Sequence, residues 1–419
     1  MQIHVVQSGQ TLYGIARTYG ISVADLSAAN QINPIQTLVI GQALVIPISG
    51  MYYFVQPGDT LYKIGRRFGV NHLRLAQMNA INPIDPLQIG FRLYIPPAPK
   101  TPVESNAYVE AVNGRFTDAA TSAVVEHAPL LTYLAPFSFE ARPDGSLATF
   151  DVSPIKGASA GSGAVLMMAV TNLENGQFSD AVGEAILNDT SVQDVLLDHI
   201  IEAAGEYGFQ DIHFDFEYLR PEDREPYNAF LKKAAQRIHA ERLLISTALA
   251  PKTSASQTGQ WYTAHDYRAH GEIVDFVVIM TYEWGYSAGP PMAVSPIGPV
   301  RQVLEYAKTE IPANKIMMGQ NLYGYDWTLP FVKGGAYARA ISPQTAISLA
   351  RENHAFIEYD YTAQAPFFYY RDASQKQHVV WFEDARSIQA KFDLLKELSL
   401  RGVSYWKLGW DFPQNWLLL

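Results

Sequence analysis

The stretch GFQDIHFDFEYL, residues 208–219, decides both the fold and the chemistry of most of this chain. Two sets of side chains alternate along it: Asp211, His213, Asp215 and Glu217 on one side, and Ile212, Phe214 and Phe216 on the other. Successive side chains of a β-strand point to opposite faces, so the pattern predicts a strand with one polar and one apolar side. In a barrel of parallel strands, the polar side would face the lumen and the apolar side the surrounding helices.

Seven other apolar runs also read as strands: Ala107–Val112, Leu131–Phe139, Ala164–Asn172, Leu243–Ala250, Val274–Glu283, Lys315–Trp327 and Val403–Gly409. Helical patterns separate most of them: Ala119–His127, Ser191–Tyr207, Pro221–Ala240, Pro299–Thr309 and Ala385–Leu400. Eight strands alternating with helices predict an α/β fold of the (β/α)8 type, a TIM barrel.

The connection after the seventh predicted strand is long. It contains the apolar runs Phe367–Asp372 and Gln377–Phe382, separated by a short polar segment. This spacing predicts a β-hairpin. We therefore expect a small α+β insertion at about residues 330–384.

Glu217 stands at the end of the predicted strand, and catalytic groups of such barrels lie at the carboxyl ends of their strands. The alternative is a buried polar network without catalysis. Burying two carboxylates two residues apart, Asp215 and Glu217, costs several kcal/mol unless they share a proton or partners. The pair therefore favours acid chemistry.

Composition excludes several classes of partner. A net charge of −10 argues against nucleic acid. The absence of cysteine rules out disulfides and thiolate metal sites.

The first residues hold no basic segment followed by a long apolar run, so we expect no signal peptide. No run of ~20 apolar residues predicts a membrane span. Nothing in the sequence indicates an oligomeric state.

An internal repeat occupies the first hundred residues. Residues 6–47 and 55–96 align without a gap at an offset of 49, and 21 of the 42 positions are identical. Each copy reads as strand, helix, helix, strand. We expect one module over 1–48, a second over 52–97, a linker over 98–105 and the barrel over 106–419.

The repeat resembles the LysM module, through the shared pattern VQxGxTLYxI…L…N…INPI…L.IG..L.IP. The resemblance implies binding of peptidoglycan or chitin, glycans that contain N-acetylglucosamine, in a shallow groove between two loops. The implied loop residues are Gly9, Thr11, Leu12, Asn33 and Ile35 in the first copy, and Gly58, Thr60, Leu61, Asn82 and Ile84 in the second. Two weak modules in tandem gain avidity on a polymer.

The opening stretch resembles the signature strand of glycoside hydrolase family 18, whose pattern is D-x-x-D-x-D-x-E. Asp215 and Glu217 match its last half, whereas Gln210 and His213 replace the two earlier aspartates. MTYEWGY (280–286), GVSYWKLGWD (402–411) and GQNLYGYDW (319–327) resemble further elements of the family, with Glu283 where the family has aspartate.

The resemblance implies a mechanism in which the substrate's own acetamide is the nucleophile. Glu217 would be the proton donor, with a pKa raised by the charge of Asp215. Asp215 would orient the acetamide, and Tyr282 would donate to its carbonyl oxygen. Sugar contacts are expected from Trp406, as the floor of the site, and from Gln320, Asn321, Tyr323, Glu283 and His213. Neither a metal nor an organic cofactor is expected.

Two LysM-like copies, the DFE strand and the ending FPQNWLLL resemble one branch, the spore cortical-fragment-lytic enzymes and related germination proteins of Bacillus-like bacteria. This implies an N-acetylglucosaminidase acting on cortex peptidoglycan at the boundary between spore coat and cortex. Two alternatives stay open: a chitinase, and a non-catalytic glycan-binding protein of the spore coat. Endo and exo cleavage, and a requirement for muramic-lactam, also stay open.

Overall fold

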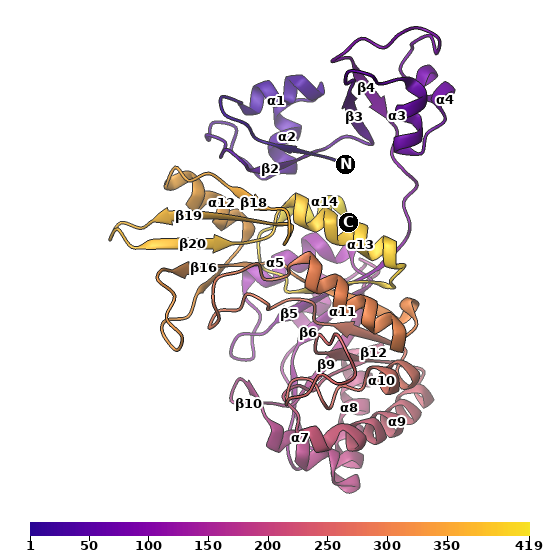
Figure 1. Cartoon of the computed structure of the whole chain (residues 1–419). Coiled ribbons are helices and arrows are strands. Elements are labelled where there is room, and N and C mark those ends of the chain that lie inside the picture. The colour runs from indigo at the N-terminus through magenta and orange to yellow at the C-terminus, as the bar shows by residue number, and fades with distance from the viewer.

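The computed structural model describes residues 1–419, and Figure 1 shows two small N-terminal modules above a large domain. Each module consists of two helices and a two-stranded antiparallel sheet, as the repeat predicts. The first contains β1 (Gln2–Val5), α1 (Leu12–Tyr19), α2 (Val23–Ala29) and β2 (Ala43–Ile46). The second contains β3 (Met51–Phe54), α3 (Leu61–Phe68), α4 (His72–Met78) and β4 (Arg92–Ile95).

Both modules are stabilised by the same local interactions. Thr11 accepts a hydrogen bond from the Gly14 N–H and caps α1, and Gly20 ends that helix in the left-handed conformation that glycine adopts without strain. Asn30 joins the second helix to the last strand, because its amide donates to the carbonyl oxygens of Leu26 and Val45 and accepts from the Val45 N–H. A buried asparagine with three such bonds has little unmet hydrogen-bonding capacity.

The large domain is a closed barrel of eight parallel strands, which confirms the expected fold. The strands are β5 (Glu104–Glu110), β6 (Tyr133–Phe137), β9 (Val165–Thr171), β12 (Asp211–Asp215), β13 (Leu244–Leu249), β14 (Phe276–Ile279), β15 (Ile316–Asn321) and β21 (Gly402–Trp406). Pairing of β9 with β12 closes the ring. β12, the strand of the opening stretch, is the fourth in chain order.

Helices surround the barrel. They are α5 (Asp118–His127), α6 (Ser153–Ala158), α7 (Asp180–Leu187), α8 (Thr190–Tyr207), α9 (Arg224–Ala240), α10 (Tyr267–Ile273), α11 (Ile297–Glu310), α13 (Ala385–Leu398) and α14 (Pro413–Leu418). Short strands β7 (Phe139–Ala141), β8 (Leu147–Ala148), β10 (Leu173–Glu174) and β11 (Gln177–Phe178) decorate the loops, with 3-10 turns at 128–130, 221–223 and 313–315. No helix is long and apolar enough to cross a membrane.

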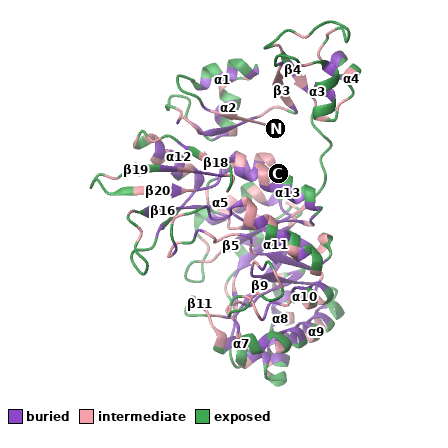
Figure 2. Cartoon of the chain, in the orientation of Figure 1, coloured by how far each residue is buried: buried purple, intermediate pink, exposed green.

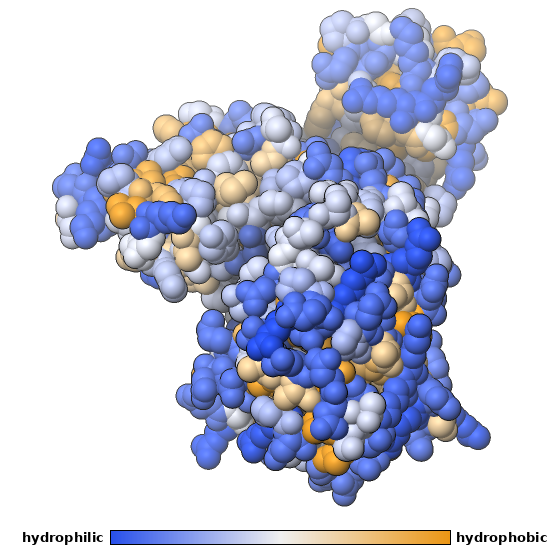
Figure 3. All heavy atoms as spheres, turned by 60° about the horizontal axis from the view of Figure 1, so that its bottom comes forward, coloured by the Kyte–Doolittle hydropathy of each residue, from blue (hydrophilic) through white to orange (hydrophobic).

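The alternation of the opening stretch has the predicted consequence. Ile212, Phe214 and Phe216 are fully buried in the main core between strands and helices, whereas Asp211, His213 and Asp215 are buried on the other side, in the barrel. Figure 2 shows this buried interior enclosed by helices with exposed outer faces. The surface seen in Figure 3 is mostly hydrophilic, with scattered hydrophobic patches.

The insertion is a five-stranded antiparallel sheet with one helix, and the expected hairpin is its β19–β20 pair. Its elements are β16 (Gly324–Thr328), β17 (Arg339–Ile341), α12 (Pro343–Glu352), β18 (Glu358–Asp360), β19 (Ala365–Arg371) and β20 (Gln377–Trp381). The single strand predicted over Lys315–Trp327 is wrong, because β15 ends in the barrel and β16 starts the insertion sheet. The continuous apolar run hid this change of direction. The sheet therefore includes residues before 330.

The first module rests on the insertion. Val39 packs among Ile347 and Phe368, and the Ile357 N–H donates to the Ile40 carbonyl at 2.9 Å. Gly41 fits so closely that an added Cβ would lie 1.8 Å from the Ile357 carbonyl oxygen. The second module contacts the first through the side chain of Gln2, which exchanges two hydrogen bonds with the Tyr52 backbone.

Candidate active site

Two acidic side chains of residues 208–219, Asp215 and Glu217, lie at the C-terminal end of β12. Asp215 is the last residue of the strand and is buried, and Glu217 follows it with a partly exposed side chain. Asn172, just after the neighbouring strand β9, fixes the Glu217 backbone. It accepts from the Glu217 N–H and donates to its carbonyl, both at 2.9 Å. Sequence reasoning missed Asn172, although it ended a predicted strand.

The two carboxyl groups are electrostatically distinct. Burial raises the pKa of Asp215 to about 7. The pKa of Glu217 is raised well above its usual value, first by burial and then by the negative charge of Asp215. The expected direction is therefore present, but burial rather than the Asp215 charge is the larger cause. Burial and the Asp215 charge thus favour the protonated form of Glu217, which is the form required of a general acid.

Glu283 and the aromatic residues of the insertion form one side of the site. Glu283 follows β14 and accepts hydrogen bonds from the hydroxyls of Tyr323 and Tyr325. Tyr282 and Trp406 both pack against this cluster. Tyr325 was not singled out in the sequence, since its contact with Glu283 depends on how the insertion folds back.

Trp406 ends β21 and lies partly exposed against Tyr108, with ring centroids 5.4 Å apart. Two predicted sugar contacts have a different environment. Gln320 and Asn321 are fully buried, and their amides donate to main-chain carbonyls: Gln320 to Asn321 at 2.9 Å and Asn321 to Tyr323 at 2.7 Å. They support the loop that carries Tyr323.

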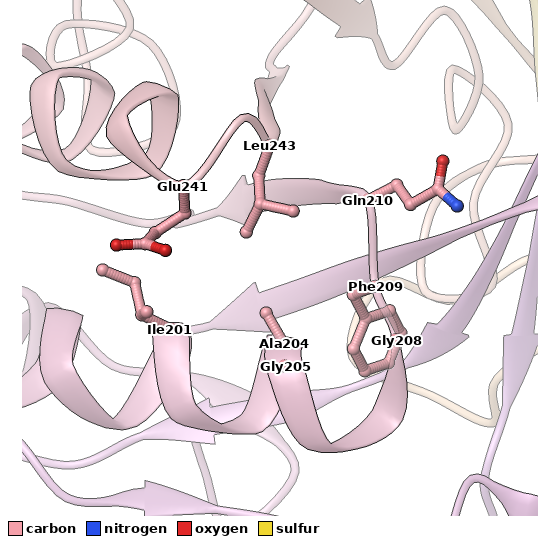
Figure 4. Close-up of a pocket in the computed structure, with 8 residues that line it drawn as sticks. All are labelled: Ile201, Ala204, Gly205, Gly208, Phe209, Gln210, Glu241 and Leu243. Atoms are coloured by element: carbon pink, nitrogen blue, oxygen red, sulfur yellow. The ribbon is translucent and has the colours of Figure 1, made fainter.

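His213 lies beneath the carboxyl pair. It is fully buried and hydrogen-bonds to the hydroxyls of Tyr108 and Ser246, each at 2.8 Å. Gln210, at the other end of β12, lines a surface hollow beside Phe209, away from the catalytic end of the strand (Figure 4). The position of the family's first aspartate is therefore remote from the carboxyl pair.

The loops of the modules present a mixture of exposed and buried residues. Ile35 and Ile84 are 90% and 85% exposed, an unusual position for isoleucine. Gly9, Gly58, Thr11, Thr60, Asn33 and Asn82 are also on or near the surface. Leu12 and Leu61 instead are buried and pack in the module cores.

A (β/α)8 barrel with an acid–carboxylate pair at the end of its fourth strand defines a glycoside hydrolase. Comparison with known proteins specifies which one. The family model of glycosyl hydrolases family 18 matches residues 138–411, and that of the LysM domain matches 4–47 and 53–96. The chain belongs to glycosyl hydrolases family 18 and carries two LysM domains.

Relatives with both parts match along the whole chain. It is 64% identical to the cortical fragment-lytic enzyme of Bacillus subtilis (strain 168), covering 100% of this chain and 97% of that protein. The crystal structure of the spore cortex-lytic enzyme SleL of Bacillus megaterium QM B1551 superposes with a TM-score of 0.93 at 55% identity, covering 100% and 96%. A chitinase structure from Chromobacterium violaceum, at 23% identity and a TM-score of 0.69 over 76% of this chain and 98% of its own, shares the fold.

Proposed function

We propose that this protein is an N-acetylglucosaminidase that hydrolyses spore cortex peptidoglycan, including released fragments, with retention of configuration. The observation that carries the proposal is the placement of Asp215 and Glu217 at the C-terminal end of β12, where burial and then the Asp215 charge raise the Glu217 pKa. The substrate class comes from the full-length likeness to cortical fragment-lytic enzymes.

The reaction proceeds in two steps that use only side chains of this chain and the substrate. Glu217 protonates the glycosidic oxygen while the acetamide carbonyl oxygen of the sugar attacks the anomeric carbon, forming an oxazolinium ion and releasing the leaving sugar. Glu217, now a carboxylate, then removes a proton from the water that opens the ring. Two inversions give net retention.

The remaining site residues position the acetamide. Asp215 holds its N–H and balances the positive charge of the oxazolinium ring, and Tyr282 donates to its carbonyl oxygen. Trp406 forms the apolar floor, since aromatic faces pack well on sugar rings. Glu283 accepts from Tyr323, and the amides of Gln320 and Asn321 donate to main-chain carbonyls. We therefore place these four residues behind those that touch the sugar.

The two modules hold the enzyme on the polymer. Ile35 and Ile84, with the adjacent glycine and threonine loops, supply the glycan surface. We place the protein at the boundary between spore coat and cortex, by analogy with its branch. Module limits of 1–48 and 52–97, a linker over 98–105 and a catalytic region over 106–419 complete this proposal.

The decisive experiment compares wild type and Glu217→Gln on purified cortex, on cortex muropeptides and on chitin oligomers. Glutamine preserves shape but has no acidic proton, so turnover should fall by at least ~10²-fold. Mass spectrometry of wild-type products should find new reducing-end N-acetylglucosamine. Preference for chitin oligomers would indicate a chitinase, and wild-type turnover in Glu217→Gln would refute the acid assignment.

A further inference from the structure

A continuous line of hydrogen bonds runs through the barrel lumen below the catalytic pair. The Ser246 hydroxyl donates to Asp211 at 2.6 Å and lies 2.8 Å from His213 Nδ1. On the other side of the imidazole, Nε2 lies 2.8 Å from the Tyr108 hydroxyl. These four side chains come from β5, β12 and β13 and are at most 3% exposed.

The donors fix the tautomer of His213. The single hydroxyl proton of Ser246 goes to Asp211, so the Ser246 oxygen accepts from His213 and Nδ1 carries the proton. Burial lowers the pKa of His213 to about 3, so the ring is neutral and Nε2 has a free lone pair. Nε2 therefore accepts the Tyr108 proton.

Asn106 and Ser404 form a separate bond nearby, in which the Asn106 amide donates to the Ser404 hydroxyl at 2.8 Å. From Tyr108 to Asp211, every proton of the line points toward Asp211. The charged and titratable groups around Asp211 are Asp275, Glu104, Arg401 and Tyr133, and Arg401 is already paired with Glu104.

We propose that Asp211 and Ser246 are positioning residues of the glycosidase site, which hold His213 as the Nδ1–H tautomer and thereby turn the Tyr108 proton away from the catalytic carboxyl pair. The proposal rests on the function proposed above. It gives a role to Asp211, for which the family resemblance supplied none.

The orientation matters because Asp215 has a buried oxygen, Oδ1, without a hydrogen-bond partner. Tyr108 packs against Trp406 with ring centroids 5.4 Å apart, and its pKa is raised first by burial and then by the charge of Asp215. With the opposite tautomer, Nε2–H would donate to the tyrosine oxygen, and the tyrosine proton would be free to turn toward Asp215. An added hydrogen bond would stabilise that carboxylate, lower its pKa and weaken its hold on the Glu217 proton.

Ser246→Ala tests the proposal, with Thr247→Val as the matched control. Thr247 is the next residue of β13, and its buried hydroxyl bonds to His270 Nδ1 at 3.0 Å on the helix-facing side. Both variants lose one buried hydroxyl–imidazole bond, but only Ser246→Ala interrupts the line. We expect its kcat to fall about tenfold and the acid limb of its pH profile to move down by about one pH unit.

A second measurement does not depend on activity. Nitrogen-15 spectra of histidine-labelled protein distinguish protonated from unprotonated ring nitrogens, and His213→Asn identifies the signals of His213. Burial raises the pKa of Asp211 to about 7, so at pH 8, where Asp211 is ionised, wild type should show a proton on Nδ1 and none on Nε2. A proton on Nε2, or a Ser246→Ala pH profile equal to that of Thr247→Val, would overturn the proposal. Activity surviving in Glu217→Gln would instead refute the proposed function and leave the tautomer result standing.

Discussion

Asp215→Asn should stabilise the protein while it destroys activity. Asp215 is 5% exposed, and one of its oxygens has no partner. Its pKa of about 7, against an ordinary 3.8, measures how unfavourable its ionised form is in the fold. Asparagine has nearly the same shape and no charge, so the substitution removes this unfavourable term.

The magnitude follows from linkage between protonation and folding. A pKa difference of about 3 units corresponds to about 4 kcal/mol at pH values where the carboxyl is ionised in both states. The hydrogen bond with Glu217, which lowers the Asp215 pKa, is already included in this difference. We therefore expect a gain of up to about 4 kcal/mol at pH 8.

The pH dependence fixes the sign. A carboxyl whose folded-state pKa is raised lowers the free energy of unfolding as pH rises from about 3.8 to about 7, and the loss is constant above that range. The advantage of the variant should accordingly be largest above pH 7 and vanish or reverse near pH 4.

Urea unfolding followed by tryptophan fluorescence is a suitable assay. All seven tryptophans lie after residue 260, so the signal reports on the barrel and insertion alone. Asp144→Asn is a control of opposite sign, because hydrogen bonds from Ser146 lower the Asp144 pKa. An Asp215→Asn protein less stable than wild type at pH 8, or a difference independent of pH, would refute the reasoning.

Three other changes test separate parts of the molecule. Val39→Asp puts a charge into the contact between module 1 and the insertion, and should lower the free energy of unfolding by at least ~2 kcal/mol in thermal unfolding. Gln88→Asp changes the matching exposed position of module 2, and should alter that free energy by under ~0.5 kcal/mol. Tyr282→Phe should lower kcat by ~10²-fold on soluble fragments, the usual loss for one donor to a developing negative charge; an unchanged kcat would remove Tyr282 from the mechanism. Ile35→Ala with Ile84→Ala should weaken co-sedimentation with cortex and leave kcat on short fragments unchanged, and undiminished sedimentation would count against the loop surface.

The alternation in residues 211–217 was sufficient to predict the orientation of the fourth strand. Period-two polarity depends only on local geometry, and the structure places both sides as expected. The repeat was equally informative, because identity at half of its positions exceeds chance. The position of the two proposed catalytic carboxyls, Asp215 and Glu217, could be predicted from the same local pattern.

Contacts between distant segments could not be predicted in this way. Tyr325 reaches Glu283 only because β16, the first strand of the insertion sheet, lies beside the segment that follows β14. Ser246 bonds to Asp211 only because β13 lies beside β12 in the observed register. The docking of module 1 did leave a signal. Val39 is apolar where the second copy has Gln88, and a difference of this kind between repeats indicates that only one is covered.

Because module 1 packs on the insertion, the two modules are attached to the catalytic domain rigidly, and do not form a flexible tether. Module 1 is held on the insertion at one end, and the chain returns from module 2 to β5 at the other, so module 2 is suspended between two attachment points. A glycan strand bound to module 2 would keep a fixed orientation relative to the mouth of the barrel. The distance between the bound glycan and the active site would then be fixed by the dimensions of the folded protein, and not by the length of a flexible linker.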